Sequence, residues 1–328
     1  AIRFNTDSSQ MEIYDGFEWT GILATSSELQ TGGTRGLWAG GEEPGGKTNR
    51  IQYVNVDTTG NSSDFGDANN SLSSHTAFAS RTRGLISGGF IGPQPTNYSN
   101  VIDFVTIAST GNAIDYGDLA VFTGGQRPGC ASATRGLVLG GMYAGIFNNT
   151  IEYMTIAQTG NSIDFGDLTN INVGGSALAS QTRGIFFNGN IPSGRSNGID
   201  YVTISTLGNA AEFGDSTSVG NHRGTAANAV RGVTAGGITP SIINTIQYVT
   251  IATLGNAIDF GDLTVARSQS YGGMSNNTRG VFLPGTNPDN VTMDYITIAS
   301  TGNAIDYGDP SITGGDMTGT SNGHGGLS

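Results

Sequence analysis

The chain has 328 residues, of which 53 are glycine, and only 12 % are charged, against roughly 25 % in an average globular protein. Glycine does not recur at every third position, which excludes collagen. The abundance of β-branched, Thr, Ser and Asn residues favours a secreted β protein over a disordered or helical one. The net charge of −12 makes nucleic acid and anionic membrane surfaces poor partners.

The first 18 residues predict a hairpin of two strands. Phe4 and the segment 11–14 alternate apolar and polar side chains, as a half-buried strand does. The chain contains no apolar run near the ~20 residues that a membrane helix needs, so we expect no membrane insertion. The single Cys130 excludes an internal disulfide and a cysteine-rich metal site.

From residue 35 onward, two short elements each occur six times. The first is Thr/Val-Arg-Gly, with arginines at spacings of 48 or 52 residues: Arg35, Arg83, Arg135, Arg183, Arg231 and Arg279. The second is Asp/Glu-Phe/Tyr-Gly-Asp, which ends at Asp67, Asp118, Asp167, Asp215, Asp262 and Asp309. Six copies at one period indicate an internal repeat over residues 35–309.

Each repeat predicts four short strands. In the third copy these are residues 131–133, 135–141, 151–157 and 162–168, and we expect Gly160 to lie in a tight hairpin turn between the last two. Four strands in a unit of about 48 residues are typical of a β-propeller blade. The fold class is therefore all-β, a propeller of four-stranded antiparallel blades in a single domain over residues 1–328.

The two ends of the chain predict how the ring closes. The tail from Ser321 to Leu327 parallels Ser275 to Val281, as if a seventh unit began and stopped. We expect a seventh, composite blade with outer strands from residues 1–18 and inner strands from residues 310–328. The alternative is a ring of six blades with the N-terminal hairpin as a separate connector.

The repeats resemble kelch blades, in which the second strand ends in Gly-Gly and the third carries a Tyr. The first feature is present at residues 40–41, 88–89, 140–141 and 236–237, and the second at Tyr53, Tyr153, Tyr201, Tyr248 and Tyr295. The fourth-strand Trp of kelch blades is absent and an aromatic ring replaces it. The repeated sequence Tyr-Val-Thr-Ile-Ala-x-Thr-Gly-Asn is also similar to repeats in virion proteins of tailed phages, notably cyanophages. This resemblance implies a place on a virion surface, or an extracellular one, among other virion proteins.

One arginine and two carboxylates recur in every repeat. Since catalysis needs a unique constellation, we interpret these residues as structural, each Arg forming a bidentate pair with an Asp of its own or the next blade. The alternative is that some of these carboxylates bind cations, although no calcium-binding motif is present. We expect no cofactor and no metal centre.

Sequence diversity is concentrated in the loops between the second and third strands and in the connections between blades. Both sets of loops emerge on one face of a propeller, and loops on a rigid scaffold commonly carry binding specificity. The unrepeated aromatic and basic residues of these loops are the candidate ligand-binding residues: Lys47, Arg50, Tyr98, Arg127, Tyr143, Phe147, Arg195, His222, Arg223, Arg267 and Tyr271.

The phage resemblance and the variable loops together predict an adhesion protein of the tail-fibre type that recognises host-surface polysaccharide. The alternative is a purely structural virion component, such as a capsid decoration or tail assembly module. An enzyme is not expected. A polysaccharide hydrolase would need two unrepeated carboxylates at a cleft, for which Glu42, Glu43 and Asp289 are available but unpaired in the sequence.

Overall fold

The computed structural model describes residues 2–5, 10–14, 19–21, 33–43, 45–92, 97–121, 125–268, 272–285, 291–311 and 314–327. The chain divides into two compact units, Ala1–Gln30 and Thr31–Ser328. The first unit holds an antiparallel sheet of three strands: β1 (Ile2–Asn5), β2 (Gln10–Tyr14) and β3 (Trp19–Gly21). In this sheet the Arg3 guanidinium lies 4.1 Å from the centre of the Trp19 ring.

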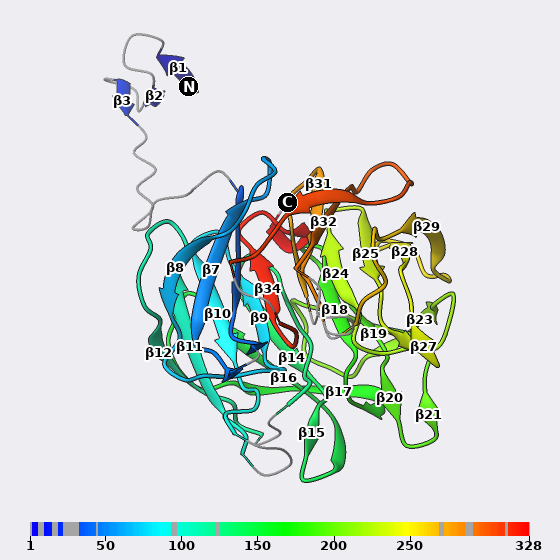
Figure 1. Ribbon diagram of the computed structural model, residues 1–328. Helices are drawn as coiled ribbons and strands as arrows, with labels where there is room; N and C mark the ends of the chain where they lie inside the picture. The colour runs from blue at the N-terminus through cyan, green and yellow to red at the C-terminus, as the bar shows by residue number, and fades with distance from the viewer. Residues whose placement is uncertain are drawn as a thin grey trace. The chain divides into compact units, whose positions relative to one another are not determined.

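The second unit is a β-propeller of six four-stranded antiparallel blades, with the first strand of each blade innermost (Figure 1). From the inside outward, blade 1 is β34 (Thr318–Ser321), β4 (Arg35–Ala39), β7 (Arg50–Asn55) and β8 (Ser63–Asp67); blade 2 is β9 (Thr76–Ala79), β10 (Arg83–Ser87), β11 (Val101–Thr106) and β12 (Ile114–Asp118); and blade 3 is β13 (Gly129–Ala131), β14 (Arg135–Leu139), β16 (Ile146–Thr155) and β17 (Ile163–Asn172). Blade 4 is β18 (Ser176–Ala179), β19 (Arg183–Phe187), β22 (Gly198–Thr203) and β23 (Ala211–Asp215); blade 5 is β24 (Gly224–Ala227), β25 (Arg231–Ala235), β28 (Thr245–Thr250) and β29 (Ile258–Asp262); and blade 6 is β30 (Gly273–Ser275), β31 (Arg279–Phe282), β32 (Met293–Thr297) and β33 (Ile305–Gly308).

The ring therefore has six blades, and the predicted seventh, composite blade is corrected to the six-bladed alternative. The reason is the phase of the repeat: a unit counted from Arg to Asp contains only the second, third and fourth strands. The first sequence repeat, from Arg35 to Asp67, therefore lacks an inner strand. The C-terminal strand β34 supplies it by pairing with β4. The described strands of the N-terminal segment do not join this blade, because β1 and β2 pair with each other and β2 with β3.

The repeated arginines join each blade to the next, but not through the predicted carboxylate. Each guanidinium lies 4.3–4.8 Å from the centre of the third-strand aromatic ring of its own blade. Each also donates to a backbone carbonyl oxygen just after the third strand of the following blade, for example Arg135 Nη1 to Ile204 O at 2.6 Å. The other five bonds reach Ile107, Ala157, Ile251, Ile298 and Val56, so the series closes from blade 6 onto blade 1.

The Thr-Gly-Asn segments also connect blades, and they are not the tight hairpin turns expected. Gly160 N donates to Tyr116 O of the preceding blade, and Asn161 Oδ1 accepts from the backbone N–H of Asp118 at 3.0 Å. The same Asn-to-Asp bond occurs at all six junctions. Gly117, with φ near 149°, leaves room for this approach, since a Cβ there would lie 2.5 Å from Gly160 O. Each outer strand is thus partly covered by its neighbour, which protects the sheet edge.

The apolar core lies between blades rather than within them. One cluster, for example, combines Leu37, Ile51 and Phe65 of blade 1 with Val105 and Ile107 of blade 2. The fourth-strand aromatic rings are buried in these clusters, and each packs edge-on against the third-strand ring.

A buried polar residue in the centre of each third strand is a recurring feature that the repeat motifs do not include. It directly precedes the aromatic residue, and its members are Gln52, Asp103, Glu152, Asp200, Gln247 and Asp294. Each of them bonds the end of the outer strand of the preceding blade or the chain that leaves it; Asp294, for instance, accepts from Thr264 Oγ1 at 2.6 Å. These buried residues could be recognised in the sequence, because each is a polar residue at a strand position whose side chain is expected to point inward.

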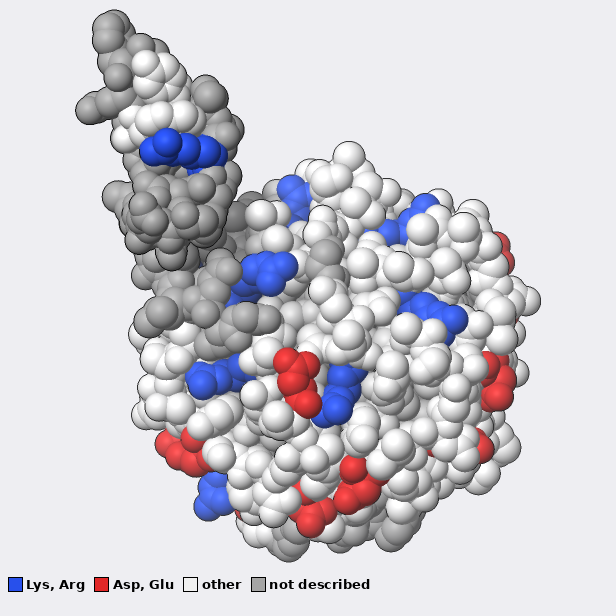
Figure 2. Space-filling view, turned by 90° about the horizontal axis from the view of Figure 1, so that it is seen from above, with Lys and Arg blue, Asp and Glu red and all other residues white. Residues whose placement is uncertain are grey.

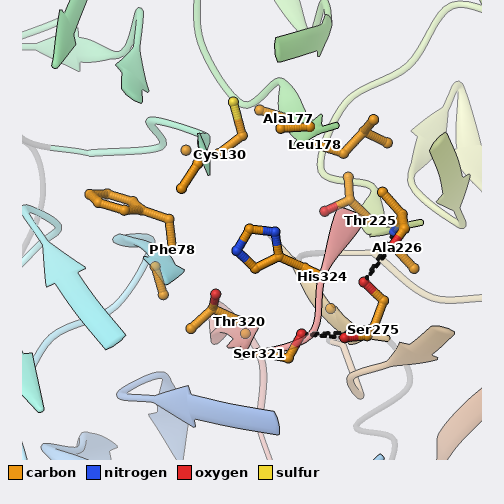
Figure 3. Close-up of a pocket in the computed structure, with 17 residues that line it drawn as sticks. Phe78, Cys130, Ala177, Leu178, Thr225, Ala226, Ser275, Thr320, Ser321 and His324 are labelled. Carbon is orange, nitrogen blue, oxygen red and sulfur yellow. Dashed lines mark hydrogen bonds between the residues drawn. The ribbon is translucent and has the colours of Figure 1, made fainter. Parts of the chain in front are cut away.

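The central channel is narrow and is occupied by the C-terminal segment. First-strand residues line it, most of them Ala, Gly, Ser or Thr but with Phe78 and Leu178 among them, and the His324 ring lies between these strands (Figure 3). His324 Nε2 is 2.8 Å from Ala79 O. The 3₁₀ turn η1 (Gly325–Leu327) follows and is buried. The free volume of this cavity is about 50 Å³, enough for water but far below the ~300 Å³ of a small-molecule site. A ligand site is therefore expected on the faces of the disc.

The three histidines predict a loss of stability in acid. Burial lowers the pKa of His75 to about 3 and those of His222 and His324 to about 4. Between pH 7 and 5 these histidines become protonated in the unfolded chain but stay neutral in the folded chain. The free energy of unfolding therefore falls by about 2 kcal/mol per histidine. Thermal unfolding at both pH values should show a drop in Tm, and His75→Leu should reduce that drop by about one third. An unchanged pH dependence in His75→Leu would contradict this assignment.

Candidate functional site

The face with the variable loops is built of short β-hairpins, and we call it the hairpin face. The hairpins connect second and third strands: β5 (Glu42–Glu43) with β6 (Gly46–Lys47), β15 (Met142–Tyr143) with the start of β16, β20 (Asn190–Ile191) with β21 (Gly194–Arg195), and β26 (Ile238–Thr239) with β27 (Ser241–Ile242). In Figure 1, β15, β20 and β21 lie at the lower end of the propeller. Backbone bridges such as Met142 to Gly125 tie each hairpin to the connection that precedes its blade. The loops are therefore held on a rigid frame.

The structure buries five of the eleven predicted ligand-binding residues, which corrects the expectation that they are exposed: Tyr98, Arg127, His222, Arg223 and Arg267. Arg127 Nη1 lies 2.5 Å from Glu152 Oε2, and Arg267 is ion-paired with Asp294. These side chains belong to variable segments, yet they turn inward and fill the junctions between blades. Tyr271 lies outside the described residues.

The other five predicted residues reach the surface. Arg50 and Arg195 are exposed, whereas Lys47 is half-buried with its Nζ 2.8 Å from Glu42 Oε1. Tyr143 is 40 % exposed, and Phe147 is half-buried in the same hairpin.

Only one pair of hairpin-face loops brings aromatic side chains together among the described residues. The rings of Phe90 and Tyr98 are 4.8 Å apart, and those of Tyr98 and Tyr143 are 5.4 Å apart. Tyr98 is buried between the other two, so it supports Tyr143 from below. Burial raises the pKa of Tyr98, so its hydroxyl stays protonated at neutral pH. The result is an ordered ring, Tyr143, that presents a surface to solvent.

The hairpin that carries Tyr143 has a well-defined turn. Ala144 and Gly145 both have positive φ, near 48° and 83°, as in the two-residue turns that match strand twist. Ile146, opposite Tyr143 in the register, is 72 % exposed. Ile91, in the neighbouring loop, is also exposed. We call Ile91, Tyr98, Tyr143 and Ile146 the aromatic patch.

The carboxylates that a hydrolase would need do not form a pair in the described part of the chain. Glu42 is engaged by Lys47. Glu43 is its sequence neighbour on the two-residue strand β5, and successive side chains of a strand point to opposite sides. Asp289 lies outside the described residues. No three His, Cys, Asp or Glu side chains in the described ranges come together in a way that could hold a metal ion.

The opposite face differs in chemistry. Figure 2 views it from above and shows basic side chains distributed over the disc. The half-buried repeated arginines begin the second strands there. A shallow depression of about 350 Å³ lies beside Arg183, lined by Ser180, Thr182, Ala229 and Ala252. It contains no aromatic ring on which a sugar could stack, so the aromatic patch is the stronger candidate.

No family model matches the chain, and no curated protein is significantly similar to it. Among the described residues, no helix has the length and apolar character needed to cross a membrane.

Proposed function

We propose that the protein is a virion adhesion protein of the tail-fibre type, whose hairpin face binds host-surface polysaccharide. The observation that carries this proposal is the aromatic patch, in which the partly exposed Tyr143 ring packs on Tyr98, which in turn packs on Phe90. Aromatic faces bind the apolar faces of sugars, and neighbouring loop amides and hydroxyls supply hydrogen bonds. The resemblance of the repeats to phage virion proteins supports the setting, with other virion proteins as partners at the particle surface.

The chain offers a matched exchange to test this function. The hairpin at residues 142–147 has the same length and strand pairing as that at residues 190–195, which carries no aromatic residue. We expect Tyr143→Ala, or replacement of residues 142–147 by the sequence of 190–195, to weaken polysaccharide binding about 5- to 30-fold, since stacking contacts of this kind are worth ~1–2 kcal/mol. A glycan array followed by titration of the bound glycan measures the loss.

Leu254→Ala is the control for this experiment. Leu254 is a well-exposed apolar side chain in the connection between β28 and β29, on the face opposite the hairpins. Its removal should leave binding unchanged. Polysaccharide binding that survives both hairpin variants would exclude the aromatic patch as the binding site.

A purely structural virion module is the second candidate, because the outer strands carry a regular series of exposed isoleucines. Ile114, Ile163, Ile258 and Ile305 occupy the same position in four blades and are 57–61 % exposed. Exposed aliphatic side chains in a repeated array favour contact with protein over sugar. If the isolated protein binds no glycan and Ile→Ser variants at these positions prevent its incorporation into particles, this second function is supported.

A further inference from the structure

The junction of blades 4 and 5 contains a buried arginine that lacks the carboxylate its counterpart has. Arg223 is 2 % exposed, and its Nη2 donates to Ser218 O at 2.8 Å. Its Nη1 is buried and has no hydrogen-bond acceptor among the described residues. A buried cation without a counter-charge is strongly unfavourable, so this site needs an explanation.

Arg127 at the junction of blades 2 and 3 is the structural equivalent of Arg223. Each follows a residue with positive φ, Gln126 near 57° and His222 near 56°. The stem of each arginine packs beneath the second glycine of a Gly-Gly pair, where a Cβ would lie 2.3–2.8 Å from the Cγ. The two guanidinium groups therefore enter the same place in their respective junctions of the ring.

The third-strand residue that faces this place differs between the two blades. In blade 3, Glu152 Oε1 accepts from Val121 N and Ser162 Oγ, and Oε2 binds Arg127. In blade 5, Gln247 Oε1 accepts from Thr217 N at 2.8 Å. Because a backbone N–H can only donate, this bond fixes the amide so that Nε2 takes the place of the carboxylate oxygen. A donor thus replaces the acceptor beside the guanidinium.

A second departure from the repeat occurs at the same spot. The residue opposite the third-strand polar group is Val138 in blade 3 and Phe282 in blade 6, but Thr234 in blade 5. The Thr234 hydroxyl is fully buried and has no partner among the described residues. Thr234 and Gln247 are directly paired across the two strands. By equivalence with the Arg127–Glu152 pair of blade 3, the Arg223 guanidinium faces this pair, so that three donors and one positive charge converge there.

We propose that this junction binds a small monovalent anion of chloride size between Arg223, Gln247 and Thr234. The anion supplies the acceptor and negative charge that Glu152 supplies in blade 3. The burial of all three side chains favours a small ion over a larger ligand. Burial lowers the pKa of Arg223 to about 10, so the guanidinium is charged at neutral pH.

Thermal unfolding of the whole chain tests the site, with chloride titrated against gluconate at constant ionic strength. Chloride should raise the Tm of the wild type in a saturable manner, by about 2–4 °C at ten times its dissociation constant. Gln247→Glu, which installs the blade 3 carboxylate, should have a higher Tm in gluconate and no response to chloride. Thr234→Val, which copies Val138, should need at least about threefold more chloride.

Bromide provides the direct observation. Crystals soaked in bromide should show an anomalous peak beside Arg223 Nη1 in the wild type and none there in Gln247→Glu. The proposal is overturned if the wild type shows no such peak, or if its Tm responds to chloride no more than that of Gln247→Glu. Because both readouts concern the blade junction, they are independent of any binding at the hairpin face.

Discussion

Removal of residues 312–328 should prevent the propeller from closing. This segment supplies β34, which pairs with β4 from Thr318↔Ala39 to Ser321↔Gly36. It also links neighbouring blades, since Thr318 Oγ1 donates to His75 O at 2.7 Å and Ser321 Oγ donates to Ser275 O at 2.6 Å. Met317 and Leu327 are buried as well. Loss of these contacts exposes the edge of β4 and opens the channel, so we expect an aggregation-prone chain without a cooperative thermal transition.

The matched control is deletion of residues 1–30, which form a separate compact unit. Circular dichroism and calorimetry should show the propeller transition of this variant within about 2 °C of the full chain. Addition of a peptide of residues 312–328 to the C-terminal truncation should restore the transition, since the strand is needed as a partner and not as a tether. A truncated chain that unfolds at the wild-type temperature would contradict the closure by β34.

The period of the sequence is enough to predict the blade, but not where each blade begins. Repeated residues mark the second to fourth strands strongly, whereas the first strands, such as Thr76–Ala79 and Gly129–Ala131, share no motif. They are three or four residues long and mix small side chains with larger ones such as Phe78 and Leu178, a pattern that many sequences match. The tail at Ser321 is therefore recognisably repeat-like, but its residues do not distinguish an additional blade from completion of the first.

The candidate ligand residues are harder to predict, because variable residues are not necessarily exposed ones. Arg127 and Arg223 turn inward since the residues before them, Gln126 and His222, have positive φ. Among the described residues, a glycine occurs at this position in blade 4, Gly174, but not in blades 3 and 5, so the sequence gives no general signal of the turn. Tyr143 can be identified from its hairpin, but its support by Tyr98 depends on the packing of two different blades.

Replacement of Glu152 by Gln should destabilise the propeller strongly, because it breaks a buried ion pair from one side. The Glu152 carboxylate is fully buried and has three partners: Val121 N, Ser162 Oγ and Arg127. The amide can keep the first two bonds through its oxygen, but its NH₂ group would face the guanidinium. Removing one partner of such a pair costs about 3–5 kcal/mol, so denaturant unfolding should show a loss of that size and Tm should fall by about 6–15 °C.

Two comparisons separate the effect of the unpaired charge from that of lost packing. The double variant Arg127→Met with Glu152→Gln removes both charges, while the amide oxygen still accepts from Val121 N and Ser162 Oγ. It should therefore recover much of the loss, because no buried charge is left without a partner. Lys47→Met breaks the pair with Glu42 at the protein surface, where the expected cost is below about 1 kcal/mol. If Glu152→Gln were as mild as Lys47→Met, the Arg127 guanidinium would have found another counter-charge, and the anion binding proposed at Arg223 would be the first explanation to test at blade 3.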